Sequence, residues 1–166
     1  GRGCARLGAL YATGLGVPMS QERALGFSQR GCELGDALGC VNVGVMYLRG
    51  DGVPMDGARA VEHFRRACEM DLGDGCRQLG ELYASGSSAV PANASLAAMY
   101  ASRACALEDA RGCGNAGMNH QVGFGVKRDE RRAAALYERA CKLGEPRFCA
   151  LLDRFERQAQ EEPGTP

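Results

Sequence analysis

Nine cysteines are the residues of this sequence whose type and spacing could most readily do chemistry. Cysteine thiolates bind zinc, act as redox pairs or join as structural disulfides. Zinc ligands and redox pairs come as closely spaced Cys-x-x-Cys motifs, and the sequence contains none. We therefore expect disulfide bonds, which in this number imply an oxidising compartment.

Two sets of disulfides fit the spacing of the cysteines. The first set joins cysteines eight residues apart, as Cys32/Cys40, Cys68/Cys76, Cys105/Cys113 and Cys141/Cys149. The alternative set is Cys4/Cys32, Cys40/Cys68, Cys76/Cys105 and Cys113/Cys141. We favour the first set because it leaves only Cys4 unpaired, near the start of a chain that lacks an initiating Met and that we interpret as a mature or excised piece. Reduced thiols buried in a repeat core are the remaining alternative.

The cysteines belong to a longer repeat. One cysteine series recurs at intervals of 36, 36, 37 and 36 residues, and other residue types keep the same step. The repeated positions are Cys4, Cys40, Cys76, Cys113 and Cys149; Gly8, Gly44, Gly80 and Gly117; Tyr11, Tyr47 and Tyr83; and the Val-Pro pairs at 17–18, 53–54 and 90–91. A period between 20 and 50 residues predicts stacked structural repeats.

Each repeat is predicted to fold as two antiparallel helices. Residues 75–86 carry apolar or small side chains at helical spacing and stop at a glycine, and residues 58–70 carry a second apolar stripe. No segment alternates apolar and polar residues as a strand would. We predict an all-α solenoid that forms one domain. The domain is predicted to span 1–160, with units over about 3–38, 39–74, 75–111 and 112–147, a capping helix over 148–160 and a flexible tail over 161–166.

These motifs resemble the Sel1-like repeat, a relative of the tetratricopeptide repeat. The resemblance rests on Ala67-Cys68-Glu69-Met70-Asp71-Leu72-Gly73-Asp74-Gly75-Cys76, on Leu79-Gly80 and Tyr83, and on Gly50-Asp51-Gly52-Val53-Pro54. More narrowly, the sequence is similar to the Helicobacter cysteine-rich proteins. The resemblance implies a right-handed superhelix stapled through Cys-x7-Cys motifs, and a scaffold or adaptor for protein partners. It also implies a minor alternative, because some cysteine-rich members are associated with penicillin binding and weak β-lactamase activity.

The composition argues against several other classes of function. The 166 residues include 20 basic and 20 acidic side chains, so no net charge attracts nucleic acid or an anionic membrane. No apolar run approaches the roughly 20 residues of a membrane-spanning helix. Catalytic motifs such as Ser-x-x-Lys, Gly-x-Ser-x-Gly and His-Glu-x-x-His are absent, and His63 and His120 lie in different repeats. We expect no enzyme activity, no metal site and no cofactor.

Helix geometry predicts which residues meet a partner. At about 100° per residue, the second, fifth and ninth positions after each first-helix cysteine lie opposite the core positions. The predicted partner-binding residues, on this side and its flanks, are Arg6, Asn42, Met46, Arg49, Gln78, Glu81, Asn115 and Asn119. The polar ladder, defined as Arg6, Asn42, Gln78 and Asn115, offers donors and acceptors that suit a peptide backbone in a concave groove. Alternatively, part of this ladder bonds with the backbone of a neighbouring helix, and Met46 packs in the core.

These observations predict a monomeric, exported bacterial protein, periplasmic or secreted, that holds a protein or peptide partner on its concave face. The alternative is a weak periplasmic protein that binds or hydrolyses β-lactams or peptidoglycan fragments. A structural spacer within a longer chain is a third possibility.

Overall fold

The computed structural model describes residues 1–87 and 89–161, which form nine α-helices and no strand. The helices are α1 (Arg2–Thr13), α2 (Gln21–Glu33), α3 (Ala37–Arg49), α4 (Gly57–Glu69), α5 (Gly73–Ser85), α6 (Ala94–Ala106), α7 (Ala110–Val122), α8 (Glu130–Lys142) and α9 (Pro146–Glu161). The predicted all-α fold is confirmed. The tail predicted over 161–166 lies outside the described residues, except for Glu161 at the end of α9.

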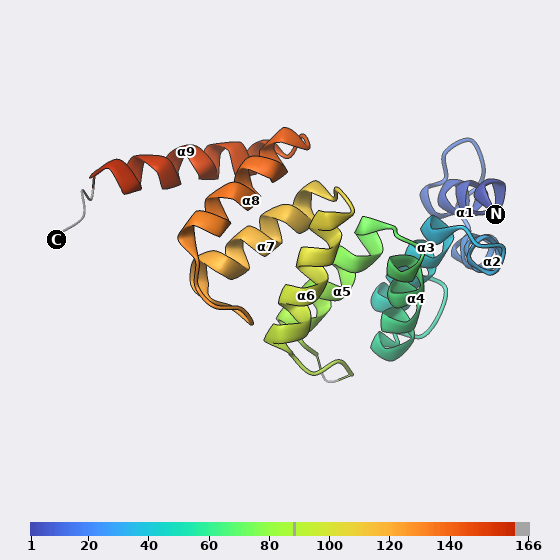
Figure 1. Cartoon of the computed structure of the whole chain (residues 1–166). Helices are drawn as coiled ribbons and strands as arrows, with labels where there is room; N and C mark the ends of the chain where they lie inside the picture. Colours follow the sequence, from blue (N-terminus) through green and yellow to red (C-terminus); the bar gives the residue numbers. More distant parts are fainter. Residues whose placement is uncertain (88, 162–166) are drawn as a thin grey trace.

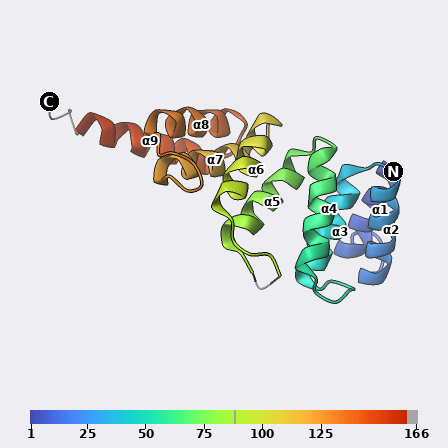
Figure 2. The same ribbon diagram turned by 60° about the horizontal axis from the view of Figure 1, so that its bottom comes forward.

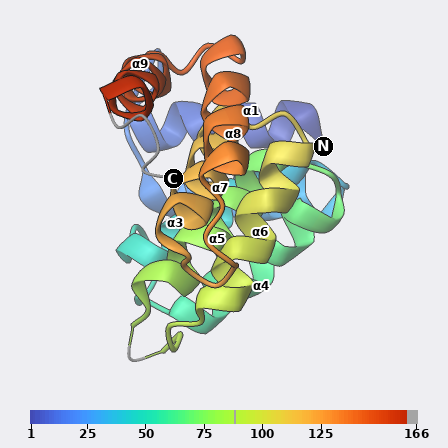
Figure 3. The ribbon, with the colours of Figure 1, turned by 60° about the vertical axis from the view of Figure 1, so that its left-hand side comes forward.

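The first eight helices form four units, each a pair of helices joined by a short loop. Unit 1 is α1–α2, unit 2 is α3–α4, unit 3 is α5–α6 and unit 4 is α7–α8. The units follow one another along a stack with the two chain termini at opposite ends (Figure 1). The last helix, α9, packs against α8 and continues past the end of the stack (Figure 2). Seen from the α9 end, the units lie behind one another, as a solenoid requires (Figure 3).

A glycine in each first helix brings the second helix of the same unit close. A Cβ atom placed on Gly44 would lie 2.6 Å from the ring of Phe64, and one on Gly117 would lie 2.7 Å from the ring of Tyr137. Both aromatic side chains are fully buried in the core. Any larger residue at these glycines would therefore push the two helices of the unit apart.

Short sequence signals set the ends of the helices. Each second helix begins after a residue whose side-chain oxygen accepts a hydrogen bond from the backbone N–H three positions later, which satisfies a free donor of the first turn. These capping residues are Ser20, Asp56, Asn93 and Asp129. The first helices α1, α3 and α7 end at Gly14, Gly50 and Gly123, each in the left-handed conformation that favours glycine.

Four disulfide bonds join each unit to the next element of the stack. They are Cys32–Cys40 between α2 and α3, Cys68–Cys76 between α4 and α5, Cys105–Cys113 between α6 and α7, and Cys141–Cys149 between α8 and α9. The structure thus has the set of bonds eight residues apart, and the longer alternative set is not formed. All nine cysteines lie in described residues, and only Cys4 has a free thiol.

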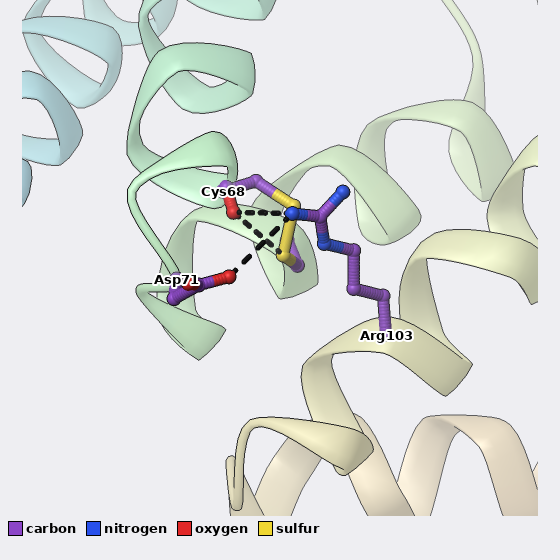
Figure 4. The surroundings of a disulfide bond; sticks show 4 residues. Cys68, Asp71 and Arg103 are labelled. Atoms are coloured by element: carbon purple, nitrogen blue, oxygen red, sulfur yellow. Dashed lines mark hydrogen bonds and ion pairs between the residues drawn. A yellow bond between two sulfur atoms is a disulfide. The ribbon is translucent and has the colours of Figure 1, made fainter.

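Polar contacts add to the disulfides at the joints between units. Arg103 of α6 donates a hydrogen bond through Nη2 to the carbonyl oxygen of Cys68 at 3.1 Å, and its guanidinium lies 3.6 Å from the carboxylate of Asp71 (Figure 4). The side chain therefore reaches back from unit 3 to the disulfide-linked turn that follows unit 2. This contact holds the turn against the next unit.

Candidate partner-binding groove

The first helix of each unit lies on the inner side of the stack. Helix α1 contacts α3, α3 contacts α5 and α5 contacts α7, whereas successive second helices approach one another less closely. In a curved stack the helices on the inner side are nearer to each other. We define the groove as the surface formed over α1, α3, α5 and α7.

Hollow A is a cavity of about 340 Å³ in the groove at unit 1, bounded by α1, α2 and α3. Asn42, Met46 and Arg49 of α3 line it, together with Ser28 of α2 and Asp51 of the following loop. The Asn42 Nδ2 atom is buried and has no hydrogen-bond partner in the described part of the chain. Hollow A therefore has an apolar wall and, in Asn42, a lining residue with an unused hydrogen-bond donor.

Hollow B is the corresponding cavity at unit 3, with a volume of about 390 Å³. Glu81, Asn115 and Asn119 line its polar side, and Ala101 of α6 contributes to its apolar side. Asn115 Nδ2 donates to Glu81 Oε1 at 3.3 Å, and Arg77 Nη1 donates to the same oxygen at 2.8 Å. The charge of Glu81 is thus balanced by an arginine that is itself largely covered.

Hollow C, of about 250 Å³, lies between α7 and the capping helix α9. Its apolar surface comes from Met118, Phe148 and Leu151, and its polar lining includes Arg147 and Arg154. Met118 also lines hollow B, so the two cavities adjoin. The groove consequently continues from unit 3 to the end of the stack.

The structure gathers most of the predicted partner-binding residues in two places. Asn42, Met46 and Arg49 line hollow A, whereas Glu81, Asn115 and Asn119 line hollow B. Arg6 and Gln78 line neither of these two hollows; Arg6 is exposed and Gln78 is half-buried.

The structure bears on two alternatives from the sequence: that Met46 packs in the core, and that part of the polar ladder bonds to the backbone of a neighbouring helix. Met46 is 5% exposed, so most of its side chain packs in the core and only a small part faces hollow A. Asn115 bonds to a neighbouring helix through the side chain of Glu81 rather than through the backbone. Asn42, its equivalent in unit 2, makes no such bond through Nδ2.

Sequence reasoning missed the second-helix residues that shape the hollows. Ser28 lines hollow A and Ala101 lines hollow B, and the repeat step places Phe64 and Tyr137 at the same position of the other two units. The alternation between a small and an aromatic residue is visible when the second helices are aligned at this step. The predicted partner-binding residues all lie on first helices, where this alternation is not visible.

The two histidines are packed into the structure. The His63 ring stacks on Tyr47 with ring centroids 5.8 Å apart, and its Nδ1 lies 3.9 Å from the Sγ of the disulfide-bonded Cys32. Burial lowers the pKa of His63. His120 is buried, with Nδ1 3.3 Å from the carbonyl oxygen of Lys127. Across residues 1–87 and 89–161, no group of three or more His, Cys, Asp or Glu side chains is placed to hold a metal ion.

Within the same part of the chain, no helix has both the length and the apolar character needed to cross a membrane. The stacked units and their inner groove define a helical-repeat solenoid, a class of protein in which each repeat adds one helix to a continuous concave surface. The Sel1 repeat family matches residues 1–36, 37–72, 73–109 and 110–145. The chain belongs to the Sel1 repeat family.

Solved structures of the same family resemble the chain. A Sel1 repeat protein from Oxalobacter formigenes is 28% identical with a TM-score of 0.82, over 91% of this chain and 61% of that one. Helicobacter pylori cysteine rich protein B is 31% identical with a TM-score of 0.66, over 80% of this chain and 95% of that one. A protective antigen of uropathogenic Escherichia coli with an SLR fold shares the fold at 24% identity, with a TM-score of 0.86 over 96% of this chain and 34% of the antigen.

The chain spans less than two thirds of the length of the Oxalobacter protein. A comparison with curated protein sequences finds no significant match. Sel1 repeat proteins are generally scaffolds for protein interactions, and their solenoid fold is typically non-catalytic. The disulfides and the similarity to the Helicobacter protein point to an extracytoplasmic protein.

Proposed function

We propose that the chain is a non-catalytic scaffold that holds an extended segment of a protein partner along the groove. The observation that carries this proposal is the pair of hollows A and B, which open on the same set of inner helices and are lined by asparagine side chains next to small and apolar ones. An amide offers both a donor and an acceptor, which matches the repeating N–H and C=O groups of a peptide.

The cellular setting and the assembly state are part of this proposal. Disulfides between all successive units are stable in an oxidising compartment, which supports a bacterial protein exported to the periplasm or secreted. The protein acts as a monomer, with residues 1–160 as one repeat domain. Its partner is a protein or peptide rather than nucleic acid, because the charges of the chain balance.

A selection from a random dodecapeptide library displayed on phage tests the proposal with the oxidised protein. Peptides that bind the wild type are expected to lose at least about tenfold in affinity for the double variant Asn115→Ala/Asn119→Ala. Glu69→Ala is the matched control, because Glu69 is exposed at the end of the outer helix α4. Peptides that bind the double variant as well as the wild type would contradict a role for the groove.

The hydrolase alternative is tested with the same proteins. We expect the homogeneous wild type to leave a chromogenic cephalosporin intact. Turnover that persists through purification and disappears in the double variant would instead assign catalysis to the groove.

A further inference from the structure

One repeat position on the second helices determines where the groove is hollow. Ser28, Phe64, Ala101 and Tyr137 occupy this position in units 1 to 4. Each lies against the glycine of its first helix, Ala101 through its backbone and the other three through their side chains. In units 2 and 4 an aromatic ring fills the space, and both rings are fully buried. In units 1 and 3 the small side chains of Ser28 and Ala101 leave hollows A and B instead.

Hollow A differs from hollow B in one buried polar group that has no hydrogen-bond partner in the described part of the chain. Ser28 is only 1% exposed and lines hollow A, where its hydroxyl takes the place that an aromatic ring fills in unit 2. The Nδ2 group of Asn42, a residue that lines the same hollow, is buried without a partner among the described residues. Buried polar groups without hydrogen bonds are unfavourable. A ligand in the hollow that offers an acceptor to the Asn42 amide gains affinity from that bond.

The charges around hollow A select the kind of group that fits. Arg49 and Asp51 both line the hollow, so opposite charges lie at one cavity and neither a cation nor an anion is favoured overall. A group that accepts hydrogen bonds from Asn42 and Arg49 while donating one to Asp51 or Ser28 matches both the donors and the acceptors of the hollow. A carboxamide does both, because its oxygen accepts and its NH₂ donates. Val45 and Met46 provide an apolar wall for the methylene groups that carry it.

We propose that hollow A is a side-chain pocket for a carboxamide of the partner, a glutamine or asparagine, and that Ser28 is the residue that opens this pocket. The proposal rests on the proposed function, because it requires a peptide in the groove. In hollow B the equivalent of Asn42 is Asn115, whose amide bonds to Glu81. Hollow B therefore serves as the matched control pocket.

The test selects peptides from the dodecapeptide library with the wild type. It then compares the affinity of these peptides for the wild type with their affinity for two variants in which a hollow is filled. Wild-type binders are expected to share a glutamine or asparagine, and its replacement by leucine should lower affinity at least about tenfold. Ser28→Phe should abolish this preference, because its ring would fill hollow A as Phe64 fills unit 2. Ala101→Phe fills hollow B and should leave the preference intact.

The variants are expected to fold, since Gly8 faces Ser28 as Gly44 faces Phe64, and a thermal melt checks this. Should Ser28→Phe not fold, Asn42→Leu removes the unused donor at similar volume and is expected to abolish the same preference.

The possible failures are distinguishable. Groove-dependent peptides without a shared carboxamide, or with a preference that survives Ser28→Phe and Asn42→Leu, would overturn the pocket and leave the proposed function standing. A shared acidic residue whose contribution is lost in Arg49→Ala would make hollow A a carboxylate pocket and overturn the carboxamide assignment. If no selected peptide depends on Asn115 and Asn119, both proposals fail.

Discussion

His63 shows at the level of one residue how the repeat tolerates a change of side-chain type. Its repeat equivalents are Phe27, Tyr100 and Leu136, and the imidazole takes the place of an aromatic ring in a stacked pair. The Tyr47–His63 centroid distance of 5.8 Å matches the 5.8 Å of Tyr83–Tyr100 and is close to the 5.5 Å of Tyr11–Phe27. A packing role explains this histidine fully.

Replacing this histidine should change how stability depends on pH. Burial, the largest cause, lowers the pKa of folded His63, while the unfolded chain keeps a value near 6.5. The unfolded state therefore binds the proton more readily, and stability is lost as the pH falls from about 6.5 towards the lowered folded value. His63→Phe keeps the stack on Tyr47, so its Tm should fall less than that of the wild type between pH 7.5 and pH 5. Equal falls in the two proteins would contradict this explanation.

Two residues adopt a backbone conformation that suits glycine better. Asp71 and Glu108 have φ values of 57° and 61° in the turns after α4 and α6, where units 1 and 4 have Gly35 and Gly144. Left-handed backbone costs a non-glycine residue about 1 kcal/mol or more. We expect Glu108→Gly to stabilise the protein by about 1 kcal/mol in chemical denaturation. Glu69→Gly, at the helical end of α4, is the control and should destabilise the protein. A loss of stability in both variants would contradict the strain at Glu108.

At the scale of the elements, each loop after a first helix lies against the second helix of the preceding unit. A Cβ on Gly52 would lie 2.9 Å from the backbone of Gln21, and one on Gly57 would meet the side chain of Ala89 at 3.2 Å. In unit 4, Gly125 lies directly against the carbonyl group of Ala94. The loops therefore lock neighbouring units together in addition to the disulfides.

This interlocking predicts different effects for the same substitution in two loops. Gly125 and Gly16 have φ values of 70° and 76°, so alanine meets similar backbone strain at both. Only at Gly125 would the new methyl group also overlap Ala94, because Gly16 has no atom within 4 Å. Gly125→Ala should therefore cost about 2 kcal/mol more than Gly16→Ala in equilibrium unfolding. Similar costs would show that the loop moves freely away from α6.

At the scale of the whole molecule, the solenoid has no single long-range core to hold its ends together. Contacts are made between neighbouring helices and between units adjacent in the stack, so each joint must be stable by itself. Each disulfide closes a short loop at one joint and contributes about 2.5 kcal/mol in the chain-entropy model. Together the four contribute about 10 kcal/mol, which is comparable to the entire stability of a typical domain.

Reduction should therefore destabilise the whole stack. We expect a strong reductant to lower the Tm by at least about 20 °C, whereas Cys4→Ser should leave it unchanged because Cys4 is outside the four bonds. An unchanged melting curve after complete reduction would mean that the joints are stable without their disulfides.

A thiol count checks the state of the cysteines in the purified protein. Under denaturing conditions without reductant we expect one free thiol, and with reductant nine. Mass mapping should then find linked peptides with cysteines eight residues apart. Nine free thiols in protein handled under oxidising conditions would contradict the extracytoplasmic setting.

The sequence by itself determined the elements of this protein, because the signals that define them are local. The helical spacing of apolar residues, the capping residues such as Asp56 and the terminal glycines such as Gly50 act within one or two turns of chain. The nearly constant step between cysteines, 36 or 37 residues, then implies that the units stack in a similar way. For this reason the four helix pairs and the all-α class follow from residue patterns alone.

Only the tertiary structure decided which groove residues lie in hollows. Hollow A is open beside Asn42 because the facing residue of α2 is Ser28 and not an aromatic one. The Asn115 amide is already bonded because Glu81 of the preceding unit lies next to it. Such contacts join residues far apart in the chain, so the angle of a side chain on its own helix does not reveal them. The angle alone predicted Arg6 and Gln78, and neither lines hollow A or hollow B. A cavity is formed by the residues around a side chain as much as by the direction in which that side chain points.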